Sequence, residues 1–173
     1  MTNPLKSLLN QPHKDTTKTG IQVLKDIYLN ASRIKYPTIP DYARAVPAYS
    51  DKTANGLTKC VIDFINLIGN QAERISNTGR QLDNRKAVTD VIGRTKMIGS
   101  IEWIPGTGTN GTADISATIQ GRSVKIEIKA GKDRQSQAQK SYQEQVERAG
   151  GIYLLIGDFQ SFYRWYLDNI IKR

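Results

Sequence analysis

Three side chains in the middle of the chain, Asp114, Glu127 and Lys129, are of the types that hydrolyse phosphodiester bonds. Residues 122–129 read RSVKIEIK, in which apolar and charged side chains alternate as they do along a β-strand. Residues 113–120 read ADISATIQ and alternate in the same way. Because alternation puts every second side chain on one face, Glu127 and Lys129 share a face of their strand.

The turn between these two strands decides which side chains meet. A turn at Gly121–Arg122 places Asp114 opposite Lys129, whereas a turn at Gln120–Gly121 places Asp114 opposite Glu127. In both registers Asp114, Glu127 and Lys129 lie on the same face. The local sequence therefore predicts that two carboxylates and one ammonium group converge.

This combination suits metal-assisted hydrolysis. Asp114 and Glu127 supply the hard oxygen ligands that Mg²⁺ or Mn²⁺ prefers, and the backbone carbonyl of Ile128 is expected to join them. A bound ion polarises a phosphate oxygen and helps to generate a hydroxide-like nucleophile. Lys129 is expected to orient the attacking water and to neutralise charge that develops on phosphorus.

The composition excludes several other chemistries. The formal net charge is +9 and the sequence pI is about 9.7, which favours a polyanionic partner such as nucleic acid. His13 is the only histidine and Cys60 the only cysteine, which disfavours histidine-based nucleophile systems, zinc sites and disulfides. The Gly-rich stretch at 106–112 lacks the ending of a phosphate-binding loop, so no nucleotide cofactor is expected. No apolar run reaches membrane-spanning length, no signal-peptide core is present, and a reducing cytoplasm fits.

The surrounding elements predict an α/β fold, a mixed β-sheet flanked by helices with an N-terminal helical extension. The pattern divides the chain into an arm with a Pro-containing connector, residues 1–50, and a domain, residues 51–173. Periodicity predicts helices at 17–35, 53–69, 136–149 and after Asp158. The predicted strands are 71–76 and 86–93, joined by a polar turn, then 96–106, 113–120, 122–129 and 152–156, the last buried on both faces.

The ordered set of motifs from residue 111 onward resembles the PD-(D/E)XK nuclease superfamily. That set is a Gly-rich loop ending in Gly111, the Asp114 strand, the Glu127–Ile128–Lys129 strand, a helix bearing Gln139, and GGIYLLI at 150–156. More narrowly it is similar to the VRR-NUC branch of phage and bacterial proteins, which is related to Holliday-junction resolvases. The resemblance covers about residues 53–173 and implies a restriction-endonuclease-like fold.

The resemblance also implies roles for individual residues. Asp114 and Glu127 would hold the metal, Lys129 would serve the attacking water, and Gln139 would lie near the metal or the phosphate. Gln139 also completes a capping box with Ser136, which would serve its own helix. Nucleic-acid contacts are expected from four basic residues, with solvated surface charge as the alternative interpretation: Arg74, Arg80, Lys132 and Arg134.

The expected function is Mg²⁺-dependent cleavage of DNA, branched or linear, in the cytoplasm of a bacterial or phage-infected cell. The resemblance also implies a homodimer. The first helix of the family commonly carries a glutamate ligand, but the helix at 53–69 has Asp63 as its only acid. Two alternatives therefore stay open: a non-catalytic nucleic-acid-binding module, and a protein that inhibits or recruits a partner through its N-terminal arm.

Overall fold

The computed structural model describes residues 18–75, 79–105, 109–129, 131 and 133–171. Among these residues, none of the helices has the length and apolarity needed to cross a bilayer. The helical elements are α2 (Gly20–Lys35), η1 (Asp41–Ala43), α3 (Ala54–Leu67), α4 (Gln137–Arg148), α5 (Phe159–Tyr166) and η2 (Leu167–Ile171). The strands are β1 (Gln71–Arg74), β2 (Arg80–Asp83), β3 (Lys86–Thr89), β4 (Thr95–Ile98), β5 (Ile101–Ile104), β6 (Ile115–Ile119), β7 (Arg122–Ile128) and β8 (Ile152–Ile156).

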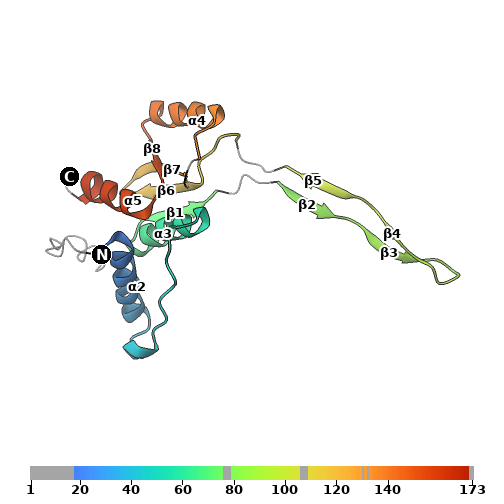
Figure 1. Cartoon of the computed structure of the whole chain (residues 1–173), viewed down its shortest axis with the longest axis horizontal. Coiled ribbons are helices and arrows are strands. Elements are labelled where there is room, and N and C mark those ends of the chain that lie inside the picture. The colour runs from blue at the N-terminus through green and yellow to red at the C-terminus, as the bar shows by residue number, and fades with distance from the viewer. Residues whose placement is uncertain (1–17, 76–78, 106–108, 130, 132, 172–173) are drawn as a thin grey trace.

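The body of the molecule is a four-stranded mixed sheet flanked by helices, which confirms the predicted α/β architecture at this level. The strand order is β1-β6-β7-β8, in which β7 and β8 are parallel and the other neighbours antiparallel. Helix α3 packs on β1, β6 and β7, and α2 and α5 pack beside it, whereas α4 contacts β8. Figure 1 shows α4 on one side of the sheet and α2 and α3 on the other.

The hydrophobic core lies between the sheet and helices α2, α3 and α5. Alternate residues of β6 and β7 are almost completely buried there, as their binary pattern requires. Phe64 of α3 is the centre of an aromatic cluster, with four edge-on ring contacts to residues of α5 at centroid distances of 5.1–5.8 Å. This packing fixes the sheet that carries the candidate site.

A tight turn fixes the register between β6 and β7. Gln120 and Gly121 both have positive φ, 48° and 79°, as a two-residue hairpin turn demands. Ile115 consequently pairs with Ile126, which is the register predicted for a turn at Gln120–Gly121. Asp114, which directly precedes β6, then lies next to Glu127 on the neighbouring strand.

Two expectations about strands are corrected. Residues 71–76 and 86–93 do not form neighbouring strands joined by a turn: β1 pairs with β6, whereas β3 pairs with β4 in a separate two-stranded arm. Strand β8 is not buried on both faces either, because Leu155 keeps 48% of its surface exposed. Helix α4 covers the part of β8 around Tyr153, where Tyr142 makes an edge-on ring contact, and leaves Leu155 uncovered.

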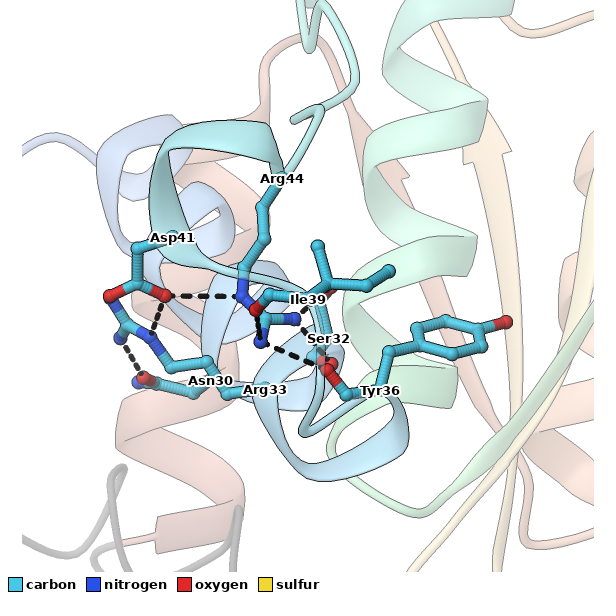
Figure 2. A network of polar contacts seen from close by, with 7 residues as sticks. All are labelled: Asn30, Ser32, Arg33, Tyr36, Ile39, Asp41 and Arg44. Carbon is cyan, nitrogen blue, oxygen red and sulfur yellow. Dashed lines mark hydrogen bonds and ion pairs between the residues drawn. The ribbon is translucent and has the colours of Figure 1, made fainter.

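The N-terminal helix shares the core of the domain. Val23, Leu24 and Ile27 of α2 are buried in the same cluster as α3 and α5, and the Gly20 N–H donates to Gln160 of α5. Residues 36–50, predicted as an extended connector, contain the η1 turn and fold back onto the end of α2. Figure 2 shows the buried Arg44 guanidinium at the centre of this fold-back, bonded to three main-chain carbonyl groups and to Asp41.

Candidate active site

The structure brings the four predicted catalytic side chains together at one end of the sheet. Asp114 precedes β6, Glu127 lies near the end of β7, and Lys129 follows β7 directly. Gln139 lies in the first turn of α4 and reaches down to the strands. The site is thus assembled by one hairpin and by the helix that comes after it.

Hydrogen bonds connect these groups. The Lys129 Nζ atom lies 3.1 Å from Glu127 Oε1 and 3.1 Å from Gln139 Oε1. The Gln139 Nε2 group also donates to Glu127 Oε1. On the neighbouring strand, Asp114 Oδ2 accepts a 2.9 Å hydrogen bond from the Ile128 N–H. One oxygen of each carboxylate is therefore held in place by the protein.

Glu127 is the unusual member of the cluster because it is a carboxylate in the interior. Its exposed fraction is 3%, and its Oε2 atom has no hydrogen-bond partner among the described residues. Burial raises the pKa of the Glu127 carboxyl, the Lys129 ammonium opposes this, and the negative charge of Asp114 raises the pKa further. An unpartnered buried carboxylate oxygen is costly unless a cation or a donor binds it, so Oε2 is a natural ligand atom.

Lys129 is held as a cation between two acids, one of which the sequence interpretation missed. Its Nζ atom lies 3.2 Å from Asp133 Oδ2 in addition to its contact with Glu127. Burial alone lowers the pKa of Lys129, but hydrogen bonds to Glu127 and Asp133 outweigh it and leave this pKa raised. Lys129 is therefore a donor and a source of positive charge. Asp133 follows the strand in a loop, where no periodic pattern could have placed it.

Gln139 forms the predicted capping box and also contacts Glu127, while its role near a metal or phosphate stays a prediction. Its Oε1 accepts from the Ser136 N–H at 2.8 Å to complete the capping box, while its Nε2 group binds Glu127. The loop before β6 lies in close contact with the same turn of α4. A Cβ on Gly111, where φ is +83°, would lie 2.4 Å from the Ala138 carbonyl group. A glycine at this position thus permits the close approach that seats Gln139 over Glu127.

The residues present fit one divalent cation. Two carboxylates lie side by side and Glu127 Oε2 has no partner among the described residues, which suits a hard ion that keeps several waters. Among the described residues, no group of three or more His, Cys, Asp or Glu side chains could hold a metal. Asp63 does not join the pair, because its Oδ2 atom accepts from the Tyr49 hydroxyl at 2.9 Å and from Lys59 at 2.6 Å. The role of the Ile128 carbonyl stays a prediction.

The four predicted nucleic-acid contacts lie around this cluster rather than in it. Arg74 is exposed at the end of β1, where it pairs with Ile115. Arg80 is exposed at the start of β2, and Arg134 is exposed in the loop before α4. Lys132 lies outside the described residues. Their contact with nucleic acid stays a prediction.

Tyr153 is a second residue of the site that the pattern did not single out. Burial, followed by the negative charge of Glu127, raises the pKa of the Tyr153 phenol to about 12. Its ring supports Tyr142 of α4 at a centroid distance of 6.2 Å. Tyr153 therefore lies between β8 and α4, on the face of the sheet that carries Glu127.

Comparison of the chain with protein-family models and with curated proteins finds no match.

Proposed function

We propose that this chain is a metal-dependent endonuclease with a restriction-endonuclease-like core, which hydrolyses DNA phosphodiester bonds at the Asp114–Glu127–Lys129 cluster. The observation that carries the proposal is the buried, unpartnered Glu127 Oε2 beside a second carboxylate and a fixed ammonium group. The net charge of +9 supports a polyanionic substrate. The motifs that suggested a nuclease lie on neighbouring elements: β6 pairs with β7, β7 pairs with β8, and Gly111 lies against α4.

Asp114 and Glu127 would hold Mg²⁺ or Mn²⁺, which supplies Lewis-acid activation of the phosphate and of water when bound. The protein's own side chains carry the remaining work. Lys129 is a cation 3.1 Å from Glu127 and is placed to orient a water and to stabilise negative charge on the phosphate. Gln139 fixes the Glu127 carboxylate so that Oε2 keeps its direction. Asp133 holds the Lys129 ammonium from the solvent side.

Cleavage of supercoiled plasmid and of a labelled four-way junction, each in Mg²⁺, Mn²⁺ and EDTA, tests the proposal. Wild type is expected to cut in the presence of either metal, and Glu127→Ala to be inactive. Lys129→Met is expected to lower the rate by a factor of about 10²–10³, as the loss of one charge-stabilising donor does. Glu144→Ala, which removes an exposed carboxylate from α4, is the matched control and should cut like wild type. Equal cutting by wild type and Glu127→Ala would exclude this site.

A non-catalytic nucleic-acid-binding module is the second candidate. It is favoured by the small number of acidic ligands: Asp63 of α3 is bound by Tyr49 and Lys59 and leaves the carboxylate pair without a third member. Such a module would bind DNA equally well in EDTA and in Mg²⁺ and would cut nothing. The cleavage assay, run together with a gel-shift measurement of binding in EDTA and in Mg²⁺, therefore separates the two functions.

A further inference from the structure

The arm formed by residues 80–104 has no assigned role in the cluster described above. Strands β2 and β5 pair at its root and β3 and β4 at its far end, and the Asn84 N–H bonds to the Ser100 carbonyl between the two ladders. Figure 1 shows this hairpin extending away from the sheet and the helices. An isolated two-stranded hairpin is marginally stable in water, so an arm of this length is expected to have a partner.

The arm is inserted in the chain next to the candidate active site. It follows Arg74 of β1 and precedes Asp114 and β6, and Arg74 pairs with Ile115 at that end of the sheet. At the usual rise of a strand, the residues from Arg80 to the tip extend over about 33 Å. One turn of B-form DNA has a length of about 34 Å. A duplex that runs along the arm would therefore be contacted over about one helical turn.

Positive charge is concentrated on one face of the outer ladder. Lys86 pairs with Ile98 and Val88 pairs with Lys96, so both lysines lie on the same face. By the same alternation, Arg94 extends this row to the tip. The opposite face is uncharged and consists of Ala87, Thr89, Thr95 and Met97.

Two acids of the arm, Asp83 and Asp90, make local contacts. Asp83 forms a 2.7 Å ion pair with Arg85. Asp90 holds the tip turn, because its Oδ1 atom accepts from the N–H groups of Ile92 at 3.0 Å and Arg94 at 2.8 Å. Asp90 keeps its negative charge, so the three cations Lys86, Arg94 and Lys96 leave a net charge of +2 (three minus one) on this face and its turn.

The tip presents apolar side chains to solvent from a well-fixed turn. Val91 and Ile92 are 104% and 68% exposed, and Asp90 fixes the backbone on both sides of them. Along the arm, Met97, Ile98 and Trp103 are also at least 58% exposed. Apolar groups held in this way are expected to contact apolar atoms of a partner.

We propose that the arm is a β-ribbon that lies in the major groove of duplex DNA. Lys86, Arg94 and Lys96 contact phosphates, and the Val91–Ile92 tip packs against apolar base edges such as thymine methyl groups. The cationic face favours DNA over a second copy of the chain, because two such faces would repel each other. The major groove of B-form DNA admits a two-stranded ribbon, whereas the deep, narrow major groove of A-form RNA does not. The inference rests on the proposed function for its choice of DNA as the substrate.

Binding of the full chain to a 30-base-pair DNA duplex, followed by fluorescence anisotropy in EDTA between 50 and 200 mM salt, tests the cationic face. The probe duplexes are about three helical turns long, and an RNA duplex of the same sequence is measured in parallel. The arm variant combines Lys86→Ala, Arg94→Ala and Lys96→Ala. The matched control removes two lysines and one arginine that are exposed elsewhere: Lys35→Ala, Lys52→Ala and Arg164→Ala.

The slope of log Kd against log salt is expected to fall by about 2.7 in the arm variant, or about 0.9 for each phosphate that the variant no longer neutralises. The control is expected to keep a slope within about one unit of wild type, and wild type to prefer the DNA duplex to the RNA duplex. An unchanged slope in the arm variant, an equal fall in the control, or equal affinity for both duplexes would overturn the proposal. Lys96→Gln alone, expected to lower the slope by about 0.9, repeats the test with a smaller change.

The tip is tested by Val91→Ser with Ile92→Ser. Both side chains are exposed, so the thermal midpoint should not fall; the affinity for duplex DNA should fall about tenfold without a change in salt slope. Sedimentation velocity of the same variant gives its oligomeric state. If wild type is a dimer, the tip variant is a monomer and both bind DNA equally well, a second copy covers the tip and the proposal is wrong. These measurements involve no cleavage, so loss of the nuclease proposal through Glu127→Ala would leave their outcome readable.

Discussion

Replacing Glu127 by glutamine separates a catalytic carboxylate from a structural one. In the folded chain Oε1 accepts from Gln139 and lies 3.1 Å from Lys129, while Oε2 has no partner among the described residues. Glutamine keeps the Oε1 acceptor and removes the buried charge. The change in the free energy of unfolding of this variant therefore reports what the ionised Glu127 carboxylate costs the folded state.

The magnitude follows from two opposing contributions. Glutamine replaces the charged, unpartnered Oε2 by a neutral amide N–H group, and removing the buried charge is worth about 1–3 kcal/mol. Against this, the Lys129–Glu127 ion pair becomes a hydrogen bond to a neutral oxygen while Asp133 stays at 3.2 Å, which costs about 1 kcal/mol. Glu127→Gln is therefore expected to be more stable than wild type by about 1 kcal/mol in EDTA.

Urea unfolding at pH 7, in EDTA and in a Mg²⁺ series, is the assay. If Glu127 is a ligand, Mg²⁺ at ten times its Kd stabilises wild type by about 1.4 kcal/mol and leaves the variant unchanged. Glu144→Gln, on the exposed side of α4, serves as the control and should respond to Mg²⁺ like wild type. A variant that is less stable than wild type in EDTA by more than about 1 kcal/mol, together with no Mg²⁺ effect on wild type, would refute the reasoning and make Glu127 a structural ion-pair partner.

Three further substitutions, one of them with a matched control, test the residues that support the site and the fold. Gly111→Ala puts a Cβ 2.4 Å from the Ala138 carbonyl at a positive φ, and is expected to lower the free energy of unfolding by about 1–3 kcal/mol in urea titrations and to slow cleavage. Arg44→Met leaves main-chain carbonyl groups without their donor (Figure 2) and should lower the free energy of unfolding by about 2–3 kcal/mol. The control Arg33→Ala breaks an exposed ion pair and should lower it by less than about 1 kcal/mol. Equal losses would show that the buried Arg44 contacts do not stabilise the fold. Phe64→Ala removes the centre of the aromatic cluster and should lower stability by about 3–5 kcal/mol in the same titration, and a loss below about 1 kcal/mol would show that the cluster repacks.

The convergence of Asp114 and Glu127 could be predicted because it depends on local chemistry. Alternation along two strands and a short turn at Gly121 are properties of neighbouring residues, and they leave a choice between two registers that keep the same face. The positive φ angles of Gln120 and Gly121 then selected the one in which the carboxylates lie side by side. The capping box of α4 was equally local, and it is formed as predicted.

Other features depend on contacts between residues that are distant in the chain. The residue types of β1 and β3 indicate strands but carry no information on which strand each will pair with, so the separate arm was not predicted. The exposure of Leu155 depends on how far α4 extends over β8.

The sequence by itself thus determined which side chains share a face, because strand alternation and turn geometry act over a few residues. Only the tertiary structure decided how that face is used. Packing of α4 buries Glu127 to 3% exposure and brings Gln139 onto its Oε1, and no residue in the described part of the chain binds Oε2. Burial and hydrogen bonding across elements set the charge and the direction of a carboxylate, and no local pattern contains them.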